Sequence, residues 1–289
     1  MSCPNSDSPI NISTTANVLS CEVFCSYMHQ YKYSACTATY YPDHIKLSYD
    51  ATTSAAVTFN NEGYNVREVN IYAPSVHMYN GSSADAEILI IHDGAGKKLI
   101  VSVPLVQSNN SATSAKILDD IIGKFSSTVD KTKTNDSQLI NVQNYNMENF
   151  IPSSPYYFYM GGAPFSPCDG QYNFVVFDKT KSPVTIGGDT LKTLTGLIQP
   201  SGIKAVSRSD YYYNSSGPNV KPGFNKDEIY IECNPTGEDG EILYQTPSPS
   251  AVDLSGLSVD NLMHNPYLNV VIGIGLSYMA LKMVGKILG

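Results

Sequence analysis

The chain has 289 residues, 42% of them hydrophobic and 15% charged, and its formal net charge is −8. This length suffices for one large domain with a buried core, with room for appended segments. Arginine occurs only at Arg67 and Arg208, and neutralising phosphates requires clustered Lys or Arg side chains. We therefore expect no nucleic-acid partner.

β-forming runs dominate the first hundred residues. After a loop-rich start, a strand is expected at 44–49. Residues 55–60 alternate toward a strand, and the Asn-Glu-Gly that follows is typical of a turn. Residues 65–92 indicate two or three strands, and the nearly continuous apolar run at 98–105 predicts a buried central strand.

Helical spacing occurs in two places. Apolar side chains recur every three or four positions in residues 114–125, which predicts an amphipathic helix, and residues 189–197 indicate a shorter one. Residues 126–140 are polar and predict an exposed loop. Further strands are expected at 156–159, 172–177 and 228–233. Many strands with few helices predict a mainly-β domain with peripheral helices.

The C-terminal quarter has a different composition. Residues 234–265 are rich in Pro, Ser, Gly and Asp, which indicates a linker or strap. Residues 266–289 are long and apolar enough to cross a bilayer as one helix if the two lysines near the end reach the interface. A buried soluble helix and an interfacial amphipathic helix are the alternatives. The N-terminus lacks the pattern of a signal peptide.

We expect this segment to be a transmembrane tail that anchors the chain to a lipid bilayer. The positive-inside rule and the absence of a signal peptide point to opposite orientations, so the orientation stays open. The residues assigned to the membrane are Leu268, Val270, Ile272, Gly273, Ile274, Leu276, Met279, Leu281, Lys282 and Lys286.

Six cysteines are distributed along the chain, at Cys3, Cys21, Cys25, Cys36, Cys168 and Cys233. An even number suggests disulfides, although counting does not give the pairing. Free buried thiols and a metal site are the alternatives. The metal site is disfavoured because the spacings lack the CxxC pairs of structural zinc sites.

Four segments resemble, in order, motifs of the α-class carbonic anhydrase family. They are Asp-Ser-Pro-Ile-Asn-Ile at 7–12, Asn-Asn-Glu-Gly-Tyr-Asn-Val at 60–66, Ser-Val-His at 75–77 followed by Glu87 and His92, and 159–168. Residues 219–222 resemble a closing motif of the same family. The resemblance covers roughly residues 3–233 and implies a domain 1–233 built on a central twisted β-sheet.

The resemblance also implies that the catalytic zinc site is missing. Members of the family hold zinc on three histidines, which lower the pKa of a bound water to about 7. The corresponding positions here are Asn70, Tyr72 and Leu89. We therefore expect no metal, no cofactor and no enzymatic activity.

Other functional positions of the family are partly replaced and partly kept. The gate positions correspond to Val76, Pro164 and Phe165, which offer no gating carboxylate or hydroxyl. His77, Glu87 and His92 match supporting, non-ligand positions. A different metal site on these three residues is thinkable, but hydrogen-bonded structural roles are the preferred interpretation. Extracellular members of the family also pair cysteines at the positions of Cys3 and Cys168, which implies a disulfide between them.

These features together resemble the membrane-anchored virion proteins of poxviruses and other large DNA viruses. The preferred hypothesis is a non-enzymatic virion structural protein, a minor capsid or membrane-linking component located in the virion. Its partners would be the bilayer and capsid or membrane proteins. The first alternative is a surface attachment protein that binds a host glycan or receptor. The second, an active zinc carbonic anhydrase, is disfavoured because the ligand positions lack histidine.

Overall fold

The computed structural model describes residues 3–4, 6–13, 18–21, 25–110, 112–143, 145–181 and 183–220. All of them belong to one compact unit, residues 1–225. The linker at 234–265, the tail at 266–289, the strand expected at 228–233 and Cys233 lie outside the described residues. Within the described ranges, no helix combines the length and apolar character needed to cross a bilayer.

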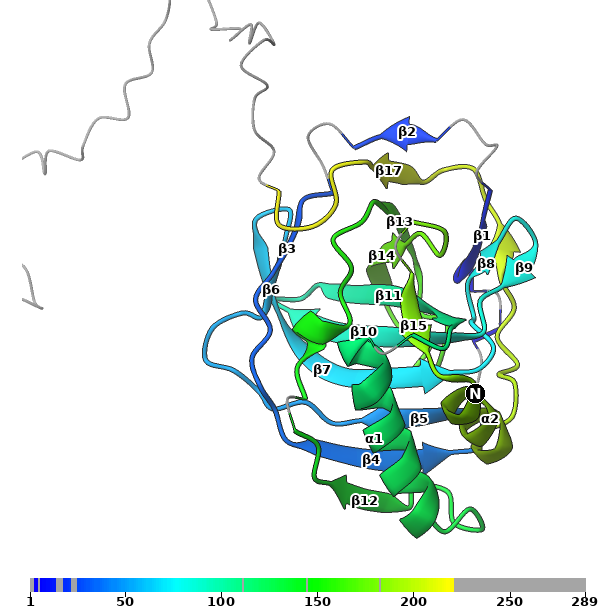
Figure 1. The fold of residues 1–289 in the computed structure, drawn as a ribbon. Helices are drawn as coiled ribbons and strands as arrows, with labels where there is room; N and C mark the ends of the chain where they lie inside the picture. The colour runs from blue at the N-terminus through cyan, green and yellow to red at the C-terminus, as the bar shows by residue number, and fades with distance from the viewer. Residues whose placement is uncertain are drawn as a thin grey trace, which may run out of the picture. The chain divides into compact units, whose positions relative to one another are not determined.

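A large mixed sheet organises the chain, and most of its members follow the order β12-β4-β5-β7-β10-β11-β14-β13-β17-β2 (Figure 1). Three strands join it off this path, with β15 on β11, β6 on β7 and β3 on β6. Its strands are β2 (Leu19–Ser20), β3 (Tyr27–His29), β4 (Cys36–Tyr41), β5 (His44–Leu47), β6 (Val57–Phe59), β7 (Glu62–Tyr72), β10 (Ala86–Gly94), β11 (Lys98–Gln107), β12 (Ser137–Ile140), β13 (Tyr156–Gly162), β14 (Gln171–Phe177), β15 (Val184–Ile186) and β17 (Tyr212–Asn214).

A smaller sheet lies beside it and contains the N-terminal arm. Its order is β16-β1-β8-β9, with β1 pairing in parallel with both neighbours. The strands are β1 (Ile10–Ile12), β8 (Met78–Tyr79), β9 (Ser82–Ser83) and β16 (Val206–Ser207). Strand β1 is thus held between β8 and β16, two segments that are distant from it in the sequence.

Helices cover only part of the sheet. The long helix α1 (Thr113–Thr128) matches the predicted amphipathic segment and buries its apolar stripe. The shorter helix α2 (Gly188–Leu197) contacts α1, and a single 3₁₀ turn, η1 (Met147–Asn149), precedes β13. The mainly-β architecture with peripheral helices is therefore confirmed.

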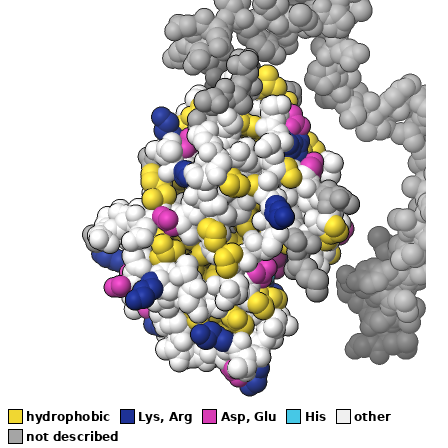
Figure 2. Space-filling model, turned by 90° about the vertical axis from the view of Figure 1, so that its right-hand side faces the viewer, with side chains coloured by type: hydrophobic (Ala, Val, Ile, Leu, Met, Phe, Trp, Pro, Cys, Tyr) yellow, Lys and Arg dark blue, Asp and Glu magenta, His cyan; other side chains and the backbone are white. Residues whose placement is uncertain are grey.

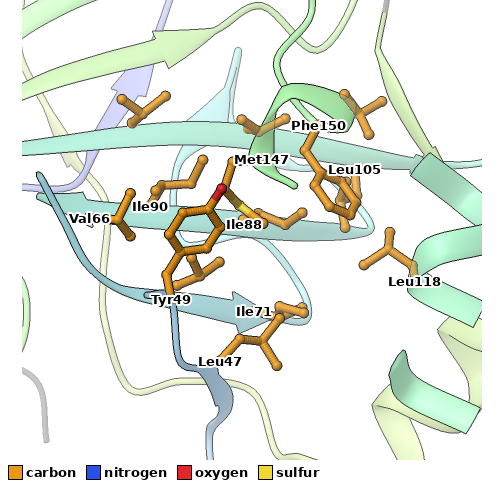
Figure 3. Close-up of a cluster of buried hydrophobic side chains, with 14 of the residues drawn as sticks. Leu47, Tyr49, Val66, Ile71, Ile88, Ile90, Leu105, Leu118, Met147 and Phe150 are labelled. Carbon is orange, nitrogen blue, oxygen red and sulfur yellow. The ribbon is translucent and has the colours of Figure 1, made fainter. Parts of the chain in front are cut away.

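The hydrophobic core lies on both faces of the central strands because side chains alternate along a strand. In β10, Ile88 and Ile90 belong to a cluster that includes Leu118 of α1 (Figure 3). Leu89 and Ile91 belong to a second cluster with Phe174 and the residues of the small sheet. The two clusters are called the helix-side core and the arm-side core below.

The predicted loop at 126–140 is partly wrong, because Ser137–Ile140 forms the edge strand β12. Only Ile140 of this strand is buried, while Leu139 is 77% exposed. The sequence of this strand therefore lacks the alternation of buried and exposed side chains that would predict a strand. Backbone pairing with β4 decides its conformation, since strand formation depends strongly on neighbouring strands.

Candidate functional site

The three positions that the resemblance matches to zinc ligands lie together on one face of the sheet. Asn70 of β7 pairs directly with Leu89 of β10, and Tyr72 pairs with Glu87 two residues along. Residues two apart on a strand share a face, so the side chains of Asn70, Tyr72 and Leu89 all point toward the arm side. All three are buried, with exposed fractions of 3%, 2% and 0%.

This set of residues does not fit a catalytic zinc ion. Such a site needs three nitrogen, oxygen or sulfur donors and one open position, and the Leu89 side chain is a hydrocarbon in the arm-side core. Burial raises the pKa of Tyr72 well above its ordinary value, so its phenol stays protonated and is a poor ligand. In the described part of the chain, no group of three His, Cys, Asp or Glu side chains could hold a metal ion.

Beside these positions, a buried hydrogen-bond network joins His77 to Glu87. The His77 Nδ1 lies 2.6 Å from Glu87 Oε1, and its Nε2 lies 2.7 Å from the hydroxyl of Tyr159. Glu87 Oε2 accepts the backbone N–H groups of Val76 at 2.6 Å and His77 at 3.1 Å, and Ser102 donates its hydroxyl to Oε1. Both polar ends of the His77 ring and the whole carboxylate are occupied.

Electrostatics favour the ionised form of Glu87. Burial alone would raise the pKa of its carboxyl, but the neighbouring His77 and the hydrogen bonds that the carboxylate accepts outweigh burial and lower it. Burial raises the pKa of Tyr159 well above its usual value, so that hydroxyl keeps its proton. A satisfied and fully enclosed network of this kind fixes the loop before β8 onto β10.

His92 lies on the opposite face of the sheet from His77. Its neighbours two and four residues back, Ile90 and Ile88, belong to the helix-side core. Its Nε2 bonds the Tyr31 hydroxyl at 2.9 Å, and its Nδ1 lies 3.3 Å from the Leu99 carbonyl oxygen. Burial lowers the pKa of His92 to about 3. His92 and His77 therefore do not converge on one site.

Of the three residues that the resemblance matches to gate positions, two line hollows and one is buried. Val76 lines a hollow of about 380 Å³ and Pro164 lines one of about 320 Å³. Ile203 and Lys204 line both hollows, so the segment around them lies between the two gate positions. Neither hollow is lined by Asn70, Tyr72 or Leu89. Phe165, the third gate position, is buried in the arm-side core.

Two disulfides are formed among the described cysteines. Cys3 is joined to Cys168, the pair that the resemblance implies, and Cys21 is joined to Cys25. The second bond was not predicted, because a spacing of four residues in a loop has no motif of its own. Cys36 is a free, buried thiol, and burial raises its pKa to about 12.

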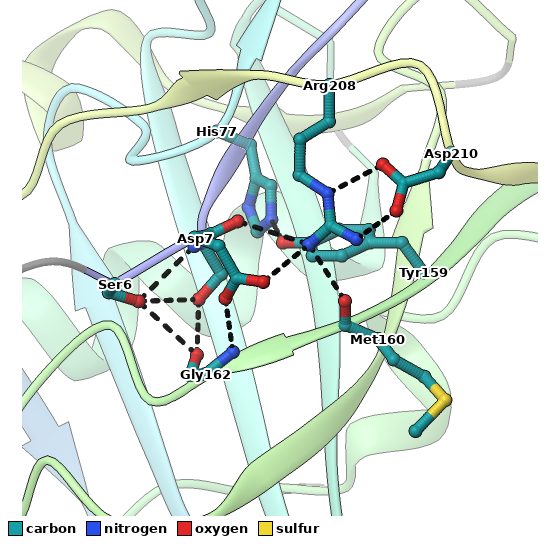
Figure 4. A network of polar contacts seen from close by, with 9 residues as sticks. Ser6, Asp7, His77, Tyr159, Met160, Gly162, Arg208 and Asp210 are labelled. Carbon is teal, nitrogen blue, oxygen red and sulfur yellow. Dashed lines mark hydrogen bonds and ion pairs between the residues drawn. The ribbon is translucent and has the colours of Figure 1, made fainter.

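Arg208 holds the N-terminal arm against β13 near the His77 network (Figure 4). Its guanidinium donates to Asp7 at 3.0 Å, to Asp210 at 2.8 Å and to the Met160 carbonyl oxygen at 2.9 Å. It also lies over the ring of Tyr159, 5.8 Å from the ring centre. Sequence reasoning missed this contact because its members are far apart in the chain.

Comparison with known proteins gives partial matches in sequence. No protein-family model matches the chain. Dioscorin DB3L of Dioscorea polystachya is 25% identical over 154 residues, which are 52% of this chain and 55% of that protein. Dioscorin dioA3 of Dioscorea japonica is 26% identical over 132 residues, 45% of this chain and 46% of that protein. The chain thus spans about half the length of the curated relatives it matches.

Solved structures match over a larger part of the chain. The structure of dioscorin complexed with ascorbate superposes with a TM-score of 0.60 at 17% identity, covering 74% of this chain and 87% of that one. The α-carbonic anhydrase of Thermovibrio ammonificans with the inhibitor sulfanilamide gives 0.58 at 17% identity, covering 73% and 87%. The chain has a carbonic-anhydrase-like fold. At such identities the likeness establishes the fold alone, so the chemistry must be judged from the residues described above.

Proposed function

We propose that the chain is a non-enzymatic carbonic-anhydrase-like protein that serves as a membrane-anchored structural component of a virion. The observation that carries the non-enzymatic part is Leu89, a hydrocarbon side chain opposite Asn70 where the fold would need a zinc donor. The closed network of His77 and Glu87 supports the same conclusion, because both groups are fully engaged in holding strands and loops together.

The composition of the chain supports anchorage to a bilayer. Residues 266–289 supply a mostly apolar stretch of the length that a membrane helix needs, with Lys282 and Lys286 near its C-terminal end. In this proposal, a folded domain is joined through residues 234–265 to that apolar stretch. In this arrangement the lipid bilayer and neighbouring capsid or membrane proteins are the partners.

The charge distribution supports protein and lipid partners better than anionic polymers. The net charge is −8, and Figure 2 shows basic and acidic side chains interspersed among small hydrophobic patches on one face of the domain. A binder of sulfated glycans would need a continuous basic patch. Attachment to a host glycan is therefore the alternative, and the cross-linking and glycan-binding measurements described below distinguish it from a structural role.

Catalysis is tested by a carbon dioxide hydration assay on the full chain with added zinc. The proposal predicts a rate equal to that of buffer with zinc alone, and no effect of a zinc-directed sulfonamide. An α-carbonic anhydrase assayed alongside is the positive control. Hydration that the sulfonamide abolishes would overturn the non-enzymatic assignment.

The structural role is tested by cross-linking intact particles and identifying the linked peptides by mass spectrometry. The proposal predicts cross-links from exposed lysines of the domain to other capsid or membrane proteins of the particle. Absence of the chain from purified particles would refute the virion role. Binding of the purified chain to heparin or chondroitin sulfate at physiological salt, without such cross-links, would favour attachment instead.

A further inference from the structure

The last described residues of the domain are held on strand β3 by Asn219. Its backbone N–H donates to the Tyr27 carbonyl oxygen at 2.9 Å, and its side-chain Oδ1 accepts the backbone N–H of His29 at 2.7 Å. Its Nδ2 lies 3.2 Å from Nε2 of the His29 ring. The yellow end of the chain runs beside β3 in Figure 1. We call this set of contacts the Asn219 clasp.

The clasp fixes which nitrogen of His29 carries the proton. A backbone N–H can only donate, so the oxygen of the Asn219 amide must face it and the NH₂ group must face the ring. Nε2 of His29 therefore accepts a hydrogen bond, and the ring proton sits on Nδ1, which lies 3.0 Å from Glu148 Oε1. The neutral ring satisfies both neighbours at once.

Few other groups act on this ring. Glu148 comes from η1, and its Oε1 also accepts the backbone N–H of Tyr31 at 2.6 Å. The rings of Tyr27 and Tyr31 lie 5.3 and 5.7 Å from the His29 ring, and burial raises the pKa of both phenols, so they stay neutral. Opposite His29 in β6 stands Val57, which carries no charge. Of these neighbours, Glu148 is the one that brings a charge to the His29 ring.

We propose that His29 is a proton-controlled switch that releases the C-terminal end of the domain when it becomes charged. A protonated ring carries N–H groups on both nitrogens, so Nε2–H would point at the NH₂ of Asn219 and two donors would face each other. Glu148 contacts Nδ1 of His29 and is not part of the Asn219 contacts, so opening of the clasp need not break that contact. Protonation therefore favours the open state.

The switch lies where the domain passes into the rest of the chain. Residues 217–220 precede the segment 221–289, which includes the predicted linker and tail. Opening of the clasp when His29 becomes charged would therefore free the attachment point of that segment. This inference uses contacts within residues 27–31, 148 and 217–220 alone and is independent of the proposed virion role.

Hydrogen exchange on the full chain tests the switch. Exchange would be measured by mass spectrometry at about pH 7.5 and about pH 5.5 and corrected for the intrinsic pH dependence of exchange. We expect the corrected exchange of peptides covering 212–220 to be faster at the lower pH by on the order of tenfold, the upper end of the net effect of losing one hydrogen bond. Peptides from β11 should show no such change.

Two variants separate the switch from a general loss of structure. Asn219→Asp places a carboxylate where the amide stands, which accepts from the backbone of His29 and from a charged ring, so the pH dependence should reverse. His29→Gln removes the titrating group, so the pH dependence should vanish. Equal corrected exchange at both pH values in the unmodified chain would overturn the proposal. The same direction of change in Asn219→Asp as in the unmodified chain would do so as well.

Discussion

Leu89 lies in β10 between β7 and β11, opposite Asn70 on one side and Ser102 on the other. Its exposed fraction is 0%, and its neighbours in the arm-side core include Ile91 and Phe174. Packing, and not coordination, is the role of this position in the present chain. An imidazole introduced here would place a polar ring in the packed arm-side core.

Replacing Leu89 by histidine should therefore destabilise the domain. We expect Leu89→His to lower the free energy of unfolding by about 2–3 kcal/mol, because a polar ring replaces a packed hydrocarbon. Urea denaturation followed by circular dichroism measures the change. Leu139→His is the matched control, because Leu139 is 77% exposed and should change stability by less than about 0.5 kcal/mol. Equal stability of Leu89→His and the unmodified chain would contradict this role.

Glu87 gives the domain a pH-dependent contribution. Its folded pKa lies below its unfolded value, so its stabilising effect is complete above the unfolded carboxyl pKa of about 4.3 and is lost as the pH falls through the folded pKa. Glu87→Gln should reduce stability at neutral pH by about 1–3 kcal/mol for each buried donor that then faces the NH₂ group of Gln instead of a carboxylate oxygen. It should also flatten the decline of stability below about pH 4.3.

Urea titrations of the two proteins at several pH values between neutrality and acid measure both effects. Glu62→Gln is the control, because Glu62 is a surface residue paired with Lys97 and its loss should leave stability almost unchanged. A Glu87→Gln variant that loses stability in acid as steeply as the unmodified chain would show that another group controls the acid side.

Among the elements, the N-terminal arm is held by several different kinds of contact. Strand β1 pairs with β8 and β16, Arg208 bridges the arm to β13, and Cys3 is bonded to Cys168. The cysteines of that disulfide are 165 residues apart, whereas Cys21 and Cys25 are 4 apart. A bond that closes a longer loop restricts the unfolded chain more.

The two disulfides should consequently differ in their effect on stability. Removing the Cys3–Cys168 bond with paired Cys→Ser changes should cost about 5 kcal/mol, against about 2 kcal/mol for the Cys21–Cys25 bond, from loop-closure entropy. Chemical denaturation under non-reducing conditions compares the two double variants. An equal loss in both would show that native contacts of the arm, and not chain entropy, determine the effect.

Sequence patterns predicted the central elements well and the edges poorly. The apolar runs of β11 and the helical spacing of α1 reflect burial on continuous surfaces, so their sequences carry the signal. Strand β12 has no such signal because it is held by backbone pairing at an edge. The contacts of Arg208 and of His29 with Asn219 join residues distant in sequence, which periodicity does not reveal.

The residues of the candidate site were identified from the family resemblance and not from the spacing of residue types. The sequence alone offers no reason to single out Asn70 or Leu89, which look like ordinary strand residues. The resemblance selects them, and the register of β7 and β10 then brings them face to face. Sequence patterns could not predict the hollows beside Val76 and Pro164, because each is formed by segments that only folding brings together. Ile203 lines both of them.

For the molecule as a whole, the proposed tail should make the chain associate with membranes. Full-length chain should float with liposomes in a density gradient and resist alkaline extraction. Ile272→Asp combined with Leu276→Asp should abolish flotation, because each charge at the centre of a membrane helix costs about 2.5–3.5 kcal/mol. Ser277→Ala, an uncharged change in the same stretch, should have no effect. Flotation that survives both aspartates would rule out a spanning tail.

The domain as a whole has a carbonic-anhydrase-like fold with a packed interior where a metal centre would be. The sheet, the pair His77–Glu87 and the Cys3–Cys168 bond hold the fold together. Leu89 and the buried Tyr72 contribute to the core at the positions where ligands would stand. We therefore predict that the stability of the folded domain does not depend on zinc.

Zinc stoichiometry of the folded chain tests this most directly. The full chain would be incubated with zinc, dialysed, and analysed for bound metal by mass spectrometry, with an α-carbonic anhydrase treated in parallel. We predict no stoichiometric zinc and no change in thermal unfolding when zinc is added, whereas the parallel enzyme retains its metal. One zinc ion per chain that survives dialysis and whose binding responds to a sulfonamide would contradict the account.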